Sequence, residues 1–301
     1  METLACIDLG GFVASDAWSH ERKVATQKGY LMRDVIKRFT VDALSVQVFE
    51  KPATLSRSVA GDVNAYLLDT LNRQGTARVI LATGNSQLQF LEDLAGLGGV
   101  DWSKVTLFHM DEYLGVSKEH PACFRRYMYD RVEQKLHPAE FHYLDGDALQ
   151  PIRECDRYEC LLREAPIDLC CLGIGDNGHL AFNDPPVADF GEARLVKIVK
   201  LDDVCKTQQV NQGHFADLQA VPAYALTLTV PALCMARKMI CLCPGAHKAK
   251  PVRAALEGPI DPICPASVLR NQSHAVLCLD AAAAGALDWT RHQCLDDTVA
   301  H

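Results

Sequence analysis

The sequence has 301 residues, of which 49% are hydrophobic and 23% charged, and its formal net charge is −8. This balance is typical of a globular protein with a sizeable core. The acidic charge disfavours nucleic acids and anionic membranes as partners, although local cations and backbone amides can still bind an anionic metabolite. No stretch approaches the ~18 uncharged apolar residues of a membrane span, and the N-terminus lacks a basic segment followed by an apolar run. We therefore expect a cytoplasmic protein.

Thirteen cysteines are scattered along the chain, several of them in apolar runs such as Asp168-Leu-Cys-Cys-Leu172 and Ile240-Cys-Leu-Cys243. An odd number in such surroundings predicts buried, reduced thiols and no disulfide framework. The ligand spacings of a zinc site are missing, so we expect no metal.

The predicted elements begin after an N-terminal extension, residues 1–43, in which 30–38 could form a short helix. From residue 44 onward, short apolar runs alternate with segments of helical periodicity, so 44–301 is predicted to be a single α/β domain. In chain order, the predicted strands are 44–49, 78–82, 105–110, 167–174, 224–230, 239–243 and 274–279. The predicted helices are 54–71, with Thr54 as N-cap, 87–97, 121–136 and 246–256.

Strands that are almost wholly apolar and alternate with helices indicate a mostly parallel sheet with helices on both faces. This is a three-layer, Rossmann-like α/β fold. Such sheets bind ligands at the carboxyl ends of their strands. The residues that follow each predicted strand are therefore the candidates for a functional site.

Two of these strand ends open directly into a predicted helix. The first is Thr83-Gly84-Asn85-Ser86, where glycine lets the backbone approach a ligand and a helix start offers free N–H groups, an arrangement that suits phosphate. The second contains Lys248 in the first turn of the predicted helix, where a positive charge opposes the helix dipole. Binding of an anion would explain a lysine at this position. The alternatives are a tight turn capped by Ser86 and an exposed lysine that is merely tolerated.

Two further strand ends carry acid–base groups. Asp111 and Glu112 follow an apolar strand, where one carboxylate could point into a cleft and act as a base, or both could be solvated or paired. The segment 173–186 places three glycines, two carboxylates and His179 directly after a buried strand. Histidine is the side-chain type best suited to proton transfer near neutral pH, and Asp176 and Asp184 are potential orienting partners of His179, which favours function over a structural glycine turn.

Taken together, these segments resemble the glucosamine-6-phosphate deaminase/isomerase family, which is related to 6-phosphogluconolactonase. The resemblance covers about residues 44–285. It rests on Phe108-His-Met-Asp-Glu-Tyr-Leu-Gly115, Gly175-Asp-Asn-Gly-His-Leu-Ala-Phe-Asn-Asp-Pro185, Val221-Pro-Ala-Tyr-Ala-Leu-Thr227 and the segment 245–248, in the order of the family.

The resemblance implies a hydrolytic isomerase that converts glucosamine 6-phosphate to fructose 6-phosphate and ammonia, without a cofactor. It implies that Asp111 is the base that moves a proton between C2 and C1, and that His179 assists opening of the sugar ring. The other implied catalytic residues, which form the relay around His179, are Asp184, Asn177 and Asp176. The residues implied to bind the phosphorylated amino sugar are Thr83, Gly84, Asn85, Ser86, Glu112, Gly178 and Lys248. Family members often form oligomers, so a homo-oligomer is expected.

The chain departs from the family pattern at several positions. Asn177 and Asp184 stand where aspartate and glutamate are usual, and Gln212 stands where an arginine is expected. Two other functions therefore remain open. One is a 6-phosphogluconolactonase, although that enzyme would carry arginine in place of Tyr113. The other is a non-catalytic, sugar-phosphate-binding regulator on the same scaffold.

Overall fold

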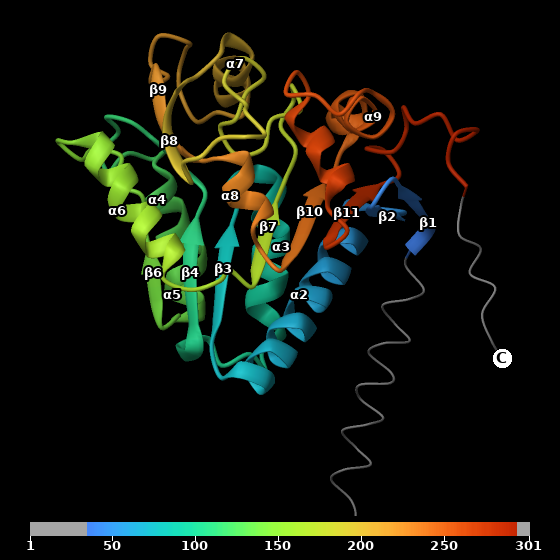
Figure 1. Ribbon diagram of the computed structural model, residues 1–301, viewed down its shortest axis with the longest axis horizontal. Helices are drawn as coiled ribbons and strands as arrows, with labels where there is room; N and C mark the ends of the chain where they lie inside the picture. Colours follow the sequence, from blue (N-terminus) through green and yellow to red (C-terminus); the bar gives the residue numbers. More distant parts are fainter. Residues whose placement is uncertain (1–34, 294–301) are drawn as a thin grey trace, which may run out of the picture.

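The computed structural model describes residues 35–293, and their main element is an eight-stranded sheet in the order β1-β2-β11-β10-β7-β3-β4-β6 (Figure 1). Its strands are β1 (Val35–Val41), β2 (Leu44–Phe49), β3 (Ala77–Leu81), β4 (Val105–His109), β6 (Glu140–His142), β7 (Leu169–Leu172), β10 (Lys238–Cys243) and β11 (Ala275–Asp280). All neighbouring pairs are parallel except β1 with β2. The predicted mostly parallel sheet is confirmed.

Helices cover both faces of this sheet. One face carries α2 (Pro52–Gln74), α3 (Leu88–Leu97), which follows the 3₁₀ turn η1 (Asn85–Gln87), and the continuous segment α4–η3–α5 (Phe124–Met128, Tyr129–Glu133 and Gln134–Leu136). The other carries α6 (Pro151–Arg163), α8 (Val230–Cys234), the turn η4 (Ala246–Lys248) with α9 (Ala249–Glu257), and the 3₁₀ helix η5 (Pro265–Asn271). A further 3₁₀ turn, η2 (Trp102–Lys104), precedes β4.

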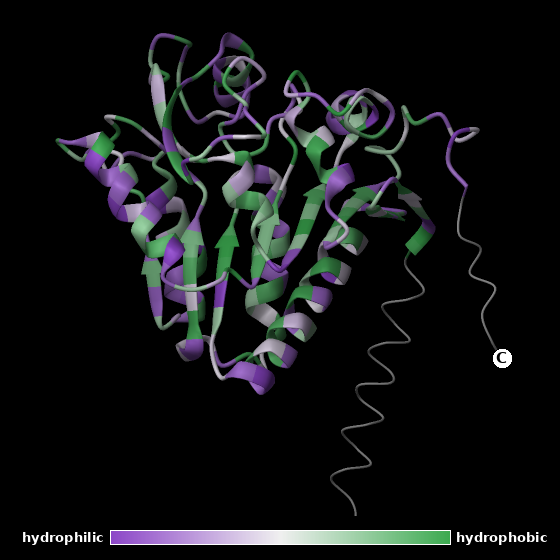
Figure 2. Ribbon diagram, viewed as in Figure 1, coloured by the Kyte–Doolittle hydropathy of each residue, from purple (hydrophilic) through white to green (hydrophobic). Residues whose placement is uncertain are grey.

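The strands pack into two separate cores because successive side chains alternate between the faces of a strand. Val79 and Leu81 of β3 pack with α2 and α3, whereas Ile80 between them packs toward α6 and α9. Figure 2 shows the same division, with apolar strands in the middle and polar residues on the outer sides of the helices. Burial on both faces explains why these strands read as continuous apolar runs.

A second, three-stranded sheet lies above the carboxyl ends of the main strands (Figure 1). It contains β5 (Asp111–Tyr113), β9 (Tyr224–Leu228) and β8 (Val196–Lys200), all antiparallel, and α7 (Asp203–Asn211) follows β8. A third apolar cluster, which includes Tyr113 and Phe182, packs these elements together. This small sheet brings residues from distant parts of the chain over one edge of the main sheet.

Several predicted details were wrong. Residues 35–38 belong to β1 and are not helical, because the segment pairs antiparallel with β2, with a register shift between Val35 and Lys37. The first long helix begins at Pro52 after Lys51, so Thr54 is not its N-cap: proline at the first helical position sets the start. Residues 1–34 of the predicted N-terminal extension lie outside the described residues, and its proposed boundary at residue 43 stays a prediction.

None of the helices in the described part of the chain is long and apolar enough to cross a membrane. The eleven cysteines of the described residues form no disulfide with one another, and eight of them are buried; Cys160 is exposed, and Cys234 and Cys264 are partly buried.

Candidate active site

A cavity of about 630 Å³ lies at the carboxyl ends of β3, β4, β7 and β10. The loops after these strands line it, together with Gln208 and Gln209 of α7 and Gln212 directly after that helix. The cavity therefore occupies the edge of the sheet where the sequence predicted a ligand site.

Two glycine loops form one side of the cavity. Gly84 and Gly245 both have positive φ values, 102° and 99°, and each precedes a 3₁₀ turn that continues into a helix. Ser86 does not cap α3, whose first turn receives no side-chain hydrogen bond. Thr83 to Ser86 all line the cavity, as does Lys248 at the second loop. The positive φ at both glycines is readily accessible only to that residue type, and it turns two helix starts toward the same space.

Asp111, the first residue of β5, lines the cavity although it is buried. The hydroxyl of Thr83 lies 3.5 Å from its Oδ1 atom. Burial, and next the charge of Glu112, raise the pKa of Asp111 to about 8. A carboxylate that binds its proton near neutral pH is suited to general base catalysis.

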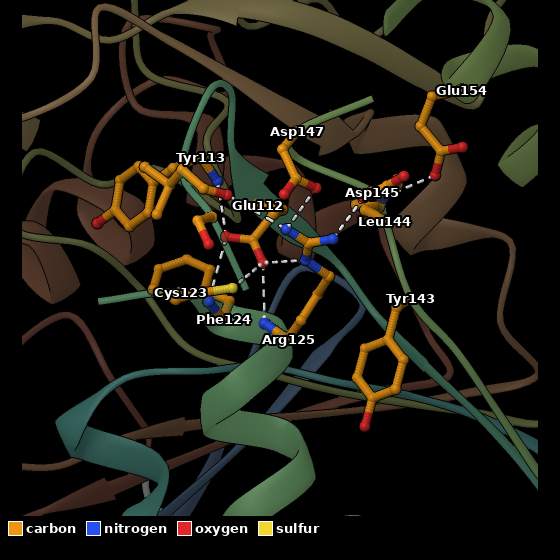
Figure 3. A network of polar contacts seen from close by, with 12 residues as sticks. Glu112, Tyr113, Cys123, Phe124, Arg125, Tyr143, Leu144, Asp145, Asp147 and Glu154 are labelled. Carbon is orange, nitrogen blue, oxygen red and sulfur yellow. Dashed lines mark hydrogen bonds and ion pairs between the residues drawn. The ribbon is translucent and has the colours of Figure 1, made fainter. Parts of the chain in front are cut away.

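Glu112, in contrast, does not line the cavity. Its fully buried carboxylate accepts backbone N–H groups from Tyr113, Phe124 and Arg125 at 2.8–3.1 Å and the thiol of Cys123 at 3.2 Å (Figure 3). The guanidinium of Arg125 adds an ion pair at 3.5 Å, and it also pairs with Asp145 and Asp147. The structure thus gives Glu112 the task of anchoring the start of α4 to β5, in place of the predicted contact with the sugar.

His179 lines the cavity, and its Nδ1 atom lies 2.9 Å from Oδ1 of Asp184 behind it. The side-chain amide of Asn177 donates to the same Oδ1 atom at 2.8 Å, while its oxygen accepts the backbone N–H of His179 at 3.0 Å. Burial alone would raise the pKa of Asp184, but the hydrogen bonds and charge of His179 and the bond from Asn177 outweigh it and lower that pKa. An ionised Asp184 can hold and orient the imidazole of His179.

The imidazole of His179 packs directly on Gly175. A Cβ atom placed at Gly175 would lie 2.0 Å from Nε2 of His179, a distance that no side chain can tolerate. This glycine therefore makes room for the ring at the cavity wall.

The two remaining predicted residues of this loop have separate environments. Asp176 lines the cavity, and its Oδ1 atom lies 2.7 Å from Nζ of Lys248. Gly178 is packed against the loop before η5, where its carbonyl accepts the N–H of Ala266 at 2.8 Å. The Sγ atom of Cys264 lies close to Gly178 as well. Gly178 does not line the cavity, so the structure does not place it at a ligand as predicted.

Among the described residues, one group of side chains has the composition of a metal site: His179, Asp184 and Cys205. Burial, together with the charges of Asp184 and Asp202, raises the pKa of the Cys205 thiol well above its usual value. Nδ1 of His179 already lies 2.9 Å from Oδ1 of Asp184, so the group is a histidine–carboxylate pair with a neighbouring thiol.

The sequence did not reveal that α7 contributes to the cavity. Four side-chain carboxamides lie in the polar, weakly amphipathic segment Lys206-Thr-Gln-Gln-Val-Asn-Gln212. This density of hydrogen-bonding side chains was the one feature of the sequence that could have indicated a contact with a ligand. Gln212 was noted as the residue in place of an expected arginine, and it does line the cavity, together with His214.

Comparison with known proteins identifies the same family that the sequence motifs resemble. The family described as glucosamine-6-phosphate isomerases/6-phosphogluconolactonase matches residues 50–278. The glucosamine-6-phosphate deaminase of Pseudarthrobacter chlorophenolicus is 36% identical over an alignment of 234 positions, which covers 74% of this chain and 88% of the relative. That of Listeria innocua is 35% identical over 207 residues, which are 69% and 86% of the two chains.

Solved structures agree with these relatives. A structure described as a monomeric glucosamine-6-phosphate deaminase has a TM-score of 0.73 and 30% identity, and it covers 80% of this chain and 99% of its own. A 6-phosphogluconolactonase from Shewanella baltica has a TM-score of 0.65 and covers 82% and 100% of the two chains. At 20% identity, that second likeness extends to the fold alone.

Proposed function

The chain belongs to the family of glucosamine-6-phosphate isomerases and 6-phosphogluconolactonases, and we propose that it is a glucosamine-6-phosphate deaminase. It converts glucosamine 6-phosphate and water into fructose 6-phosphate and ammonia. The observation that carries this proposal is one cavity that is lined by a buried base, Asp111, a histidine backed by a carboxylate, His179, and a buried lysine, Lys248.

Asp111 supplies the central proton transfer. In the open-chain sugar, its carboxylate removes the proton from C2 and a proton is delivered to C1, so that C1 is reduced as C2 is oxidised to an imine. Water then adds to C2 and ammonia leaves, which yields the ketose. Because the oxidation and reduction occur within one substrate, acid–base groups suffice and the reaction calls for no external electron acceptor.

His179 serves the preceding step, the opening of the pyranose ring. It transfers a proton between the ring oxygen and the C1 hydroxyl, while Asp184 stabilises the imidazolium form and Asn177 holds the carboxylate of Asp184 in place. Asp184 and Asn177 do not line the cavity, so they act as positioning residues through His179.

The phosphate of the substrate binds between the two glycine loops. The helix starts at η1 and η4 offer backbone N–H groups and the positive ends of helix dipoles, and Lys248 adds a full charge. The four carboxamides at the end of α7 face this space and can hydrogen bond to sugar hydroxyls.

The decisive experiment is an ammonia-release assay with purified protein and a panel of hexosamine 6-phosphates that includes the galactosamine epimer. We expect release from glucosamine 6-phosphate and its loss in Asp111→Asn. Hydrolysis of 6-phosphogluconolactone without ammonia release would favour the lactonase. Tight sugar-phosphate binding with neither activity would favour the regulator.

Two sequence-based expectations stay predictions: that the enzyme acts in the cytoplasm and that it forms homo-oligomers. The similar deaminase described as monomeric makes the second worth an early test by light scattering on the purified chain.

A further inference from the structure

Lys248 is the only lysine or arginine among the described residues that line the cavity, and its charge is already neutralised. Its Nζ atom lies 2.7 Å from Oδ1 of Asp176. The other titratable residues that line the cavity are Asp111, His179, His214 and His247. A phosphate that enters this cavity therefore approaches a lysine that already forms an ion pair with a carboxylate of the same chain.

We infer that the carboxylate of Asp176 competes for Lys248 with the phosphate group of the substrate: it holds the phosphate subsite until phosphate binds, and phosphate then displaces it. This inference rests on the proposed function for the identity of the sugar. It requires only that an inorganic or organic phosphate binds at Lys248.

The burial of the two partners determines which one moves. The side chain of Lys248 is 5% exposed, whereas that of Asp176 is 35% exposed. Lys248 is therefore confined by its surroundings, while the carboxylate of Asp176 can rotate into solvent at little desolvation cost. An incoming phosphate would displace Asp176 and keep Lys248 in place.

The backbone around Asp176 does not need to move with its side chain. The N–H group of Asp176 donates to Oε1 of Gln208 at 3.2 Å, which ties the loop to α7. The next residue, Asn177, is directed to the other side of the loop, where it contacts Asp184 and Asp202. A rotation of the Asp176 side chain thus leaves the His179–Asp184 pair undisturbed.

This ion pair has two consequences. When no ligand is bound, the ion pair provides the buried ammonium group of Lys248 with a partner, and a buried charge without a partner would be costly. In the presence of sugars, only a ligand that carries a phosphate can displace the carboxylate, because a dianion offers more negative charge to Lys248 than the carboxylate does and a neutral sugar offers none. The ion pair lowers the affinity of the subsite for all anions. Unphosphorylated sugars gain no binding energy from Lys248, because they cannot displace Asp176.

The test is the affinity for inorganic phosphate, measured by calorimetry on the full chain without turnover. Asp176→Asn removes the competing charge and should tighten phosphate binding about tenfold. Asp203→Asn is the matched control, because it changes net charge equally at an exposed position of α7 outside the cavity; it should bind phosphate as the unchanged protein does. Lys248→Gln should abolish binding in either background.

Thermal unfolding gives a second measurement. Without phosphate, Asp176→Asn should melt at a lower temperature than the unchanged protein, because Lys248 loses its partner, and phosphate should raise its melting temperature by more. Asp176→Ser serves as a second variant if Asp176→Asn folds poorly. Unchanged or weaker phosphate binding in these variants would overturn the inference and assign Asp176 to orienting Lys248. Failure of ammonia release with tighter phosphate binding would refute only the proposed reaction.

Discussion

The carboxylates of Asp111 and Glu112, neighbours on β5, point to opposite sides of that strand. Asp111 faces the cavity, whereas Glu112 is buried beneath it among the backbone N–H groups at the start of α4 (Figure 3). The charge of Glu112 contributes to the raised pKa of Asp111, second to burial. In the proposed reaction Asp111 transfers the proton, whereas Glu112 holds β5 to the start of α4 and contributes to the raised pKa of Asp111.

The first prediction concerns the pH dependence of catalysis. Burial and the Glu112 charge favour the protonated form of Asp111, while the reaction needs the carboxylate. We therefore expect kcat/KM to rise with pH through about 8, the pKa of Asp111, and then to level off. Asp111→Asn should reduce kcat by about 10²–10⁴-fold at every pH. A rate that falls between pH 7 and 8 would contradict the assignment of Asp111 as base.

The second prediction concerns Glu112→Gln. Loss of the charge should lower the pKa of Asp111, so the midpoint of the kcat/KM profile should move to lower pH. The variant should also lose about 1–3 kcal/mol in free energy of unfolding, since donors buried around residue 112 lose a charged acceptor. The control is Glu92→Gln, an exposed carboxylate of α3. If the variant is destabilised but the midpoint of its kcat/KM profile stays at the same pH, the role of Glu112 is purely structural.

The third prediction concerns the carboxylate behind His179. Asp184→Asn keeps the shape of the side chain but removes the charge that lies 2.9 Å from the imidazole. We expect kcat to fall by about 10²–10⁴-fold, while the affinity for inorganic phosphate, which binds elsewhere in the cavity, stays unchanged. Equal losses in kcat and in phosphate affinity would point to collapse of the loop and not to a role in proton transfer.

The fourth prediction concerns the contact between Gly175 and His179. In Gly175→Ala, the new Cβ atom would occupy the position of the imidazole, so the ring must leave the cavity wall and kcat should fall sharply. Gly191→Ala is the matched control. Its Cβ would meet its nearest neighbour at an ordinary 3.6 Å, and the residue lies outside the cavity. Comparable activity of the two variants would show that His179 does not need this position.

The sequence predicted the main sheet well because its buried strands are apolar on both faces and end in glycine-rich loops. It also located eight of the twelve proposed site residues at the cavity: Thr83, Gly84, Asn85, Ser86, Asp111, Asp176, His179 and Lys248. The small sheet was largely missed, because β5 has three residues and β8 pairs with β9, far along the chain. The contribution of α7 was missed for the same reason, because the pairing of β8 with β9, which are far apart in the sequence, brings its carboxamides to the cavity.

Residue types and their order were sufficient to predict which loops carry chemistry, since apolar strands and the glycines that follow them are local features. The direction of each side chain was decided by the tertiary structure. Asp111 and Glu112 are separated by the alternation of a strand, and Asp176 and Asn177 by a turn that directs one to Lys248 and the other to Asp184. Adjacent residues of similar chemistry thus have different tasks, because packing around the loop, and not the order of residues, determines which partner each one meets.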